Sequence, residues 1–476
     1  MLNIYLKIST SLFLASLISA CSLTGFSDIF SSYNEQMQNV KIAQQQGDFE
    51  QALTSMPKRN NRHSSYNLSL LEKARLEFLT GKYLPSQKHF ELAYLQIQKD
   101  EQAAKIQLSR SIQNATAVVS NDNVMSYVIP YYEQSMLHSY QALNYLNKND
   151  LPGALVEIRR ANLVQSKALK ANQKTLHSSQ QKMLNEGVGL ETLANKYPSQ
   201  VNAIGQVKNG FQNAYTFYLS GVLYEAAGKA NDAYIDYKKA LEIYPANITL
   251  QKDVWRLANR LGMDNDILNF KEHLAPSITK AQKVIPQSGQ LVIISEHGII
   301  NNKQEVSFNL PVFTHNNNMR FYSVALPRYS NNLRHYSGLS INYQGKQYQS
   351  QEIVRLQSLA AKQLQDTMPA IVTRQIIRLI AKEKLRQKIS NQGGDIGNIL
   401  ASLYNIVSEK ADTRSWSTLP DSIHILRLNL TSGQHTLKLN IAGENRTITV
   451  DINQNRQTLI TLTSINKHLS YQNITL

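Results

Sequence analysis

Residues 214–245 constrain the fold of this chain more than any other feature of its sequence. Small and large apolar residues alternate there at fixed intervals, at Phe217, Gly221, Tyr224, Gly228, Ala233, Tyr237, Ala240 and Pro245. Small side chains let two antiparallel helices approach closely, and large side chains fill the gaps that remain. A proline then ends the second helix, because it lacks the amide that would continue the ladder. The stretch therefore predicts a helical hairpin.

The same pattern recurs along the N-terminal half with a period of 34 residues. Units begin at Tyr33 and Asn67, which lie one period apart, at Ser135, two periods further on, and again at Ala214. This arrangement resembles the tetratricopeptide repeat (TPR), whose helix pairs stack into a solenoid. The resemblance implies an all-α repeat domain over residues 21–274.

Three stretches of this domain depart from the regular frame. Residues 101–134 are apolar but lack the small residues, so we interpret them as a degenerate unit. Residues 167–213 break the register and are interpreted as a polar insertion of longer helices around two glycines. Residues 253–274 predict a helix that caps the last repeat.

In the TPR family, the first helix of each pair lines a concave surface that holds peptides. Carried onto the units at Ser135 and Ala214, this implies a partner-binding surface formed by Met136, Leu143, Leu146, Tyr215, Tyr218, Val222 and Glu225. Aromatic and aliphatic anchors of this kind dominate binding energy at protein interfaces. The alternative is that the insertion at 167–213 fills the groove, so that this surface is internal.

The pattern changes after residue 275, where prolines and a glycine indicate a linker over 275–288. Residues 289–476 then alternate apolar and polar residues with a period of two, which predicts a β-rich domain. Strands are expected at 290–296, 304–313, 321–327, 424–430, 435–441, 446–452 and 457–463. The last four are separated by short polar turns, so we expect an antiparallel meander that forms half of a small sandwich.

Helices are inserted between these strands, at about 351–411. The first is expected to kink or restart at Pro369, and a second is expected from Asp395 to Ala411. The fold class is therefore α+β, with an N-terminal TPR-like solenoid followed by a β-rich, sandwich-like domain that carries inserted helices.

The N-terminus predicts export and lipidation. Lys7 precedes an apolar run that ends in Leu17-Ile18-Ser19-Ala20-Cys21, and Cys21 is the only cysteine of the chain. The run is too short to span a bilayer and is typical of a signal peptide over residues 1–20. Its end resembles the bacterial lipobox, which implies a lipidated Cys21 (palmitate among its acyl groups). By the same resemblance, Ser22 favours the outer membrane. The alternative is an ordinary signal peptide with an incidental cysteine.

Several stretches outside the repeats add to this picture: residues 137–162, 289–312 and 409–430. Together with 214–245 they resemble a family of bacterial TPR-containing outer-membrane lipoproteins of uncharacterised function. The resemblance implies the two-part architecture and the outer-membrane assignment. We expect the lipid-anchored body to face the periplasm. It implies no reaction and supplies no catalytic residues.

The sequence offers little for catalysis. Gly221 and Gly228 lie too far apart for a phosphate loop, and the repeat frame explains both. No zinc or hydrolase motif is found, so no metal, cofactor or enzyme activity is predicted. The net charge of +16 suggests acidic partners such as anionic lipid or envelope glycans rather than nucleic acid, which an exported protein does not meet routinely. A solvated basic surface with no specific partner is the favoured interpretation of this charge.

Two basic clusters remain as candidate sites. Asp412 and Arg414 form a possible polar ligand pair beside Trp416 as a stacking platform, although a structural joint is the favoured interpretation. Arg374, Arg378 and Lys382 lie four residues apart beside an apolar stripe. One interpretation is that this helix lies on anionic lipid. The favoured interpretation is that the stripe packs on the sheet and the charges stay in water.

These observations support a non-catalytic outer-membrane lipoprotein. It acts as a TPR scaffold or assembly factor that binds envelope proteins or peptides through its groove. The alternative function is an envelope lipoprotein that binds glycan or lipopolysaccharide through Trp416, Arg414 and the C-terminal β domain.

Overall fold

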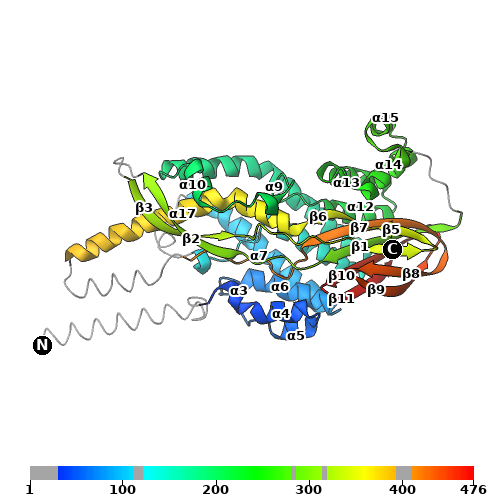
Figure 1. Ribbon diagram of the computed structural model, residues 1–476, viewed down its shortest axis with the longest axis horizontal. Coiled ribbons are helices and arrows are strands. Elements are labelled where there is room, and N and C mark those ends of the chain that lie inside the picture. Colours follow the sequence, from blue (N-terminus) through cyan, green and yellow to red (C-terminus); the bar gives the residue numbers. More distant parts are fainter. Residues whose placement is uncertain (1–30, 111–121, 280–285, 314–318, 393–409) are drawn as a thin grey trace.

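The computed structural model describes residues 31–110, 122–279, 286–313, 319–392 and 410–476. The predicted signal peptide and Cys21 lie outside the described residues. The molecule is elongated, and helices lie both above and below the strands in the view of Figure 1. The α+β fold class is confirmed, because helices fill the N-terminal half and strands dominate the C-terminal half.

The N-terminal half contains the helix pairs that the repeat frame predicts. At Gly221 an added Cβ would lie 2.4 Å from the Tyr237 ring, so the absence of a side chain lets the second helix pack closely. This is the contact that the small residue of the frame was expected to allow. The paired helices are α3 (Tyr33–Gln36) and α4 (Gln38–Gln45) with α5 (Phe49–Thr54); α6 (Tyr66–Leu79) with α7 (Tyr83–Arg110); α8 (Tyr131–Leu146) with α9 (Leu151–Asn185); and α12 (Ala214–Ala226) with α13 (Ala230–Ile243).

The irregular stretches do not all follow their predictions. Residues 101–110 continue α7, the short 3₁₀ helix η3 spans Asp122–Val124, and α8 begins at Tyr131. Residues 111–121 lie outside the described residues, so the degenerate unit stays a prediction. The capping region is two helices rather than one, because Gly262 in the left-handed conformation separates them. The remaining helices are α10 (Leu190–Lys196), α11 (Val201–Ile204), α14 (Ile248–Leu261), α15 (Asp264–His273) and α16 (Pro276–Thr279).

The strands form a five-stranded sheet in the order β11-β10-β1-β7-β6, a four-stranded sheet in the order β5-β4-β8-β9, and the separate hairpin β2-β3. All seven predicted strands are confirmed. The strands are β1 (Ser288–His297), β2 (Gln304–Phe313), β3 (Met319–Arg328), β4 (Ser340–Tyr343), β5 (Lys346–Gln349), β6 (Gln351–Arg355), β7 (Ser422–Thr431), β8 (Gly433–Ile441), β9 (Glu444–Ile452), β10 (Gln457–Ile465) and β11 (His468–Thr475).

The predicted C-terminal meander is wrong in its pairing. β7 lies in the five-stranded sheet, β8 and β9 pair in the other sheet, and β10 returns to lie parallel to β1. Only one residue separates β7 from β8, and Gly433 at the start of β8 has a φ of 127°. A residue without a Cβ can adopt this backbone, so the chain crosses from one sheet to the other there.

The five-stranded sheet is buried on both faces. On one face Val292, Ile294 and Ile425 pack in the same core as the helices. On the other, Leu291 and Ile293 pack against the second sheet. The layers are therefore helices, sheet and second sheet, which explains why β1 reads as a continuous apolar run.

The long helix α17 (Leu356–Gln392) continues through Pro369, so a new helix does not start there. The helical block therefore starts at 356 rather than 351, because 351–355 form β6. The second predicted helix falls mainly on residues 393–409, which lie outside the described residues. α17 packs along α9, α11 and strand β3. The second half of α9 and all of α11 belong to the insertion at 167–213, so the insertion supports α17.

Candidate functional site

The concave face of the helical repeats is occupied by the chain's own five-stranded sheet. All of the predicted partner-binding residues are enclosed there. Tyr215, Tyr218 and Val222 have no exposed surface, and the side chain of Glu225 is 6% exposed. Met136, Leu143 and Leu146 are buried in the same core.

The expected partner surface is therefore internal in this structure. The structure agrees with the alternative that this surface is internal. The groove is filled by the five-stranded sheet, however, and not by the insertion at 167–213. The apolar side chains that would bind a peptide belong instead to one core that also contains residues of β1, β7 and β10.

Arg427 of β7 is the centre of a buried ion-pair cluster between helices and sheet. Its guanidinium lies 3.0 Å from Glu225 Oε2 and 3.1 Å from Asp253 Oδ2, and it donates to Tyr237 OH at 2.6 Å. Arg256 of α14 also pairs with both carboxylates. Burial acts to raise the pKa of Glu225, but the two arginines outweigh it and lower the pKa to about 2.

A second cluster ties the other end of the sheet to the helices. Glu296 of β1 accepts hydrogen bonds from Tyr140 Oη and Thr463 Oγ1, both at 2.7 Å, and pairs with Arg75 of α6. Arg75 is 1% exposed. Buried charges are tolerated only when they are paired and hydrogen-bonded, so the two clusters fix how the repeats fit the sheet.

The segment 411–421 runs between the helices without regular structure, and we call it the strap. Glu72 of α6 accepts hydrogen bonds from the backbone amides of Ser417 and Thr418, at 2.7 and 3.0 Å. Glu133 of α8 accepts from the amide of Trp416 at 3.1 Å. Both carboxylates are fully buried, so they take the place of the β-ladder that the strap lacks.

Glu133, which holds the strap at Trp416, has a raised pKa. It also accepts hydrogen bonds from Tyr127 Oη and Tyr132 Oη, each at 2.9 Å. Burial raises the pKa of Glu133 to about 7, although these donors and the Trp416 amide act to lower it. Glu133 therefore titrates near neutral pH while it holds the strap in place.

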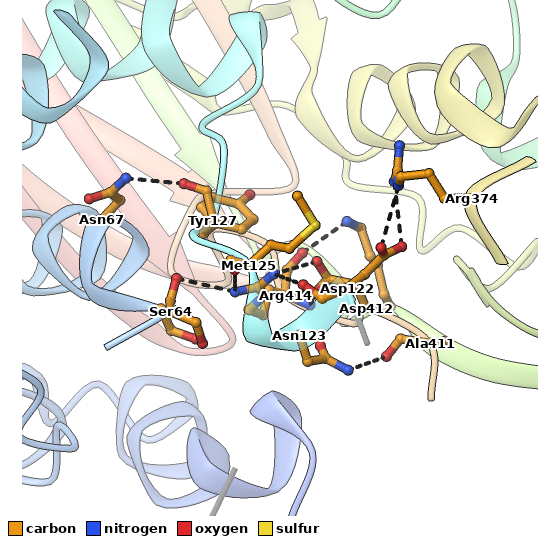
Figure 2. Close-up of polar contacts among 12 residues, drawn as sticks. Ser64, Asn67, Asp122, Asn123, Met125, Tyr127, Arg374, Ala411, Asp412 and Arg414 are labelled. Carbon is orange, nitrogen blue, oxygen red and sulfur yellow. Dashed lines mark hydrogen bonds and ion pairs between the residues drawn. The ribbon is translucent and has the colours of Figure 1, made fainter. Parts of the chain in front are cut away.

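Arg414 lies inside a shell of acceptors (Figure 2). It donates to Asp412 at 2.8 and 2.9 Å, and to the backbone carbonyls of Ser64, Met125 and Asp122 at 2.9–3.2 Å. Burial acts to raise the pKa of Asp412, but the Arg414 charge keeps it below its usual value. The arginine thus joins the strap to the turn before α6 and to the loop before α8.

Trp416 has no exposed surface, and its indole N–H donates to Thr418 Oγ1 at 3.0 Å. Its ring packs against Phe90 and Tyr140. It is therefore not a stacking platform for a ligand. Asp412, Arg414 and Trp416 form the structural joint that the sequence analysis favoured, and the ligand interpretation of the cluster is wrong.

An apolar cavity of about 700 Å³ lies beside this joint. α7, α9, α17 and the loop before α8 surround it. Arg414 and Lys303 separate it from a more polar cavity of about 770 Å³ that reaches Ser31 and Tyr33. The lining of the first cavity includes Ile97, Ile129, Ala168, Phe211, Leu364 and Ile371.

One side of this apolar cavity carries exposed hydrophobic side chains. Val128 is 74% exposed, Met125 is 46% exposed, and Tyr131 is also exposed. All three belong to the loop before α8 or to its first residue, and all three line the cavity. We call them the cavity rim. Exposed apolar side chains beside an apolar hollow are typical of binding surfaces.

The apolar stripe of α17 packs into the core, as the favoured interpretation expected. Arg378 is 2% exposed, so the expectation that the charges stay in water is wrong for this residue. Val372 and Ile376 of its apolar stripe have no exposed surface. Arg378 pairs with Asp122 at 2.7 Å, and Arg374 lies 3.4 Å from the same carboxylate (Figure 2). This stripe therefore faces the core rather than a membrane.

Within the part of the chain that the structure describes, no group of three histidines, cysteines or acids could hold a metal ion. The same residues contain no helix that is long and apolar enough to cross a bilayer. Glu72, Glu133 and the cavity rim are functional candidates that the sequence alone did not indicate. The signals were weak, because the carboxylates' partners lie 283–346 residues away in the sequence.

No family model matches the sequence, and no curated protein sequence matches it. Among solved structures, the chain is similar to MamA, at 11% identity and a TM-score of 0.27 over 49% of this chain and 90% of that one. It is similar to the TPR-like repeats of a Podosopora anserina kinesin light chain, at 12% identity and a TM-score of 0.26 over 50% and 91%. The TPR2AB domain of yeast Sti1, in a complex with pHSP90, matches at 11% identity and a TM-score of 0.19 over 50% and 86%. No conclusion about activity or partners follows from scores this low.

Proposed function

We propose that this protein is a non-catalytic scaffold that binds an envelope protein or peptide while it is anchored to the outer membrane by Cys21. The lipobox at residues 17–21 supports the anchor, and the helical repeats support the binding role. The observation that carries the proposal is the apolar cavity of about 700 Å³ with its exposed rim. The concave face is occupied by the sheet, so the partner binds at this cavity instead.

The clusters around Arg427 and Glu296 support a rigid platform. They lock the repeats onto the sheet, so that the cavity keeps its shape between α7, α9 and α17. A preformed apolar hollow binds a partner's side chain at a low entropic cost. The glycan-binding alternative is not supported, because Trp416 and Arg414 are enclosed in the strap joint.

The cavity rim provides the test. Val128→Asp places a charge on an exposed side chain, so the fold is expected to tolerate it. Affinity purification of the lipidated protein from membranes should recover the partners of the wild-type protein at least about tenfold less well, because a buried unpaired charge costs well over 1.4 kcal/mol.

Ile235→Asp is the matched control, because Ile235 is a 51% exposed residue of α13 that does not line the cavity. This variant should recover the wild-type partners. Equal recovery by Val128→Asp and wild type would show that the cavity rim is not the binding surface.

A further inference from the structure

The β2-β3 hairpin exposes a contiguous apolar face near its closed end. Phe313, Met319 and Phe321 are each more than half exposed. Phe313 pairs with Met319 across the hairpin, and Pro311 pairs with Phe321. Cross-strand partners, and residues two apart along a strand, project from the same face, so these side chains form one patch. We call it the hairpin patch.

The opposite face of the hairpin is packed and rigid. Leu310, Val312 and Val324 are buried in the main core beside α17. Arg320 pairs with Glu383 of α17 at 2.6 Å. The hairpin patch is therefore held outward by a fixed support.

The end of β2 is also tied to the turn after α9. The Phe313 amide donates to the Gly187 carbonyl at 3.1 Å. A Cβ on Gly187 would lie 2.0 Å from the Phe313 oxygen, and the residue has a φ of 82°, so only glycine fits this contact. The turn keeps the hairpin from folding its apolar face inward.

The hairpin projects from the part of the molecule where the described chain begins. Asn34 of α3 donates to the Lys303 carbonyl at 2.5 Å, one residue before β2, and Ser31 lines a cavity with Gln304. Ser31 lies ten positions after Cys21, and ten residue steps span at most about 36 Å. Each hairpin strand has ten residues and rises about 33 Å. A lipidated Cys21 and the hairpin patch can therefore reach one bilayer surface together.

The charge of the same end favours an anionic surface. In sequence, the last part of α17 carries Lys382, Lys384, Arg386 and Lys388 against a single acid, Glu383. This end of α17 and the hairpin both extend to the left in Figure 1, away from the sandwich and α15. Basic residues beside an apolar patch attract anionic headgroups and place apolar side chains at the acyl boundary.

We propose that the hairpin patch enters the interfacial region of the anionic bilayer to which Cys21 is anchored. This inference rests on the lipid anchor of the proposed function. It adds a second, non-covalent contact that fixes the orientation of the body on the membrane. The cavity rim would then be held at a constant height above the lipid.

The test uses the full-length, lipidated protein with one introduced thiol, Met319→Cys, labelled with the environment-sensitive fluorophore NBD. Reconstitution into phosphatidylethanolamine–phosphatidylglycerol vesicles should shift its emission to the blue. Nitroxide-labelled lipid should quench it, and iodide should lose access. The blue shift should be smaller when phosphatidylcholine replaces phosphatidylglycerol, because the membrane surface then loses the negative charge that attracts basic residues.

Leu268→Cys is the matched control, because Leu268 is a 61% exposed residue of α15, far from the hairpin. Its emission should not change on reconstitution. The proposal is overturned if the two positions behave alike, or if Met319→Cys is shielded only when a protein is added.

The wild-type protein separates the two proposals, since Cys21 is its only cysteine. If wild type takes up label, the lipid anchor is wrong. The hairpin comparison is then made in a Cys21→Ser background with added vesicles, where a blue shift at position 319 still supports the membrane contact.

Discussion

Arg427→Met is expected to lower the free energy of unfolding by about 3–5 kcal/mol, because two buried carboxylates then share Arg256 as their one remaining arginine partner. Glu225 and Asp253 both face Arg427 from the helices, and their side chains are 6% and 3% exposed. Denaturant unfolding monitored by circular dichroism measures the loss.

Arg446→Met is the control for this variant. Arg446 is an exposed residue of β9, so its replacement should change the free energy of unfolding by less than about 0.5 kcal/mol. A loss below about 1 kcal/mol for Arg427→Met would mean that the cluster does not hold the repeats on the sheet.

Cys21→Ser should abolish acylation and processing by the lipoprotein signal peptidase. The body should then appear as an unprocessed precursor or a soluble periplasmic species that still folds. The reason is that small residues precede the only cysteine at the end of an apolar run of suitable length. Membrane fractionation with metabolic palmitate labelling measures both effects.

Ser22→Asp tests the sorting part of the same prediction, since it should shift the lipidated protein toward the inner membrane. Palmitate label that persists on Cys21→Ser would place the anchor at another residue.

The periodic parts of the fold could be predicted from the sequence. The 34-residue frame located the helix pairs, and the period of two located seven strands to within a few residues. Both signals are local, because each element shows its buried face in its own sequence. The partner of each face is not local, which is why the strand pairing of the C-terminal region was wrong.

The internal position of the concave face shows the same limit. Tyr215 and Tyr218 have the character of peptide-binding anchors, and the same side chains serve equally well to hold a sheet. One signal was available, because Arg427 and Glu296 are charges within apolar strands. Such charges need partners of opposite sign, and the helices carry them at Glu225, Asp253 and Arg75.

The strap joint was predicted in part. The cluster at 411–416 was recognised as a structural joint from its own residues, with the ligand site as the alternative. The helix carboxylates that hold the strap, Glu72 and Glu133, were not recognised, because a single glutamate in a helix gives no sign of burial. Their role follows only from the tertiary arrangement.

In the proposed function, the repeats stay closed on the sheet while a partner binds at the cavity rim. Asn147 at the end of α8 donates to Gln472 of β11 at 3.1 Å, so a cysteine pair at these positions can lock the closed arrangement with a reducible crosslinker. Partner recovery by the locked, lipidated protein should equal that of the same protein after reduction. Partners that are lost on locking and return on reduction would show that the concave face must open to bind them, which would contradict the account.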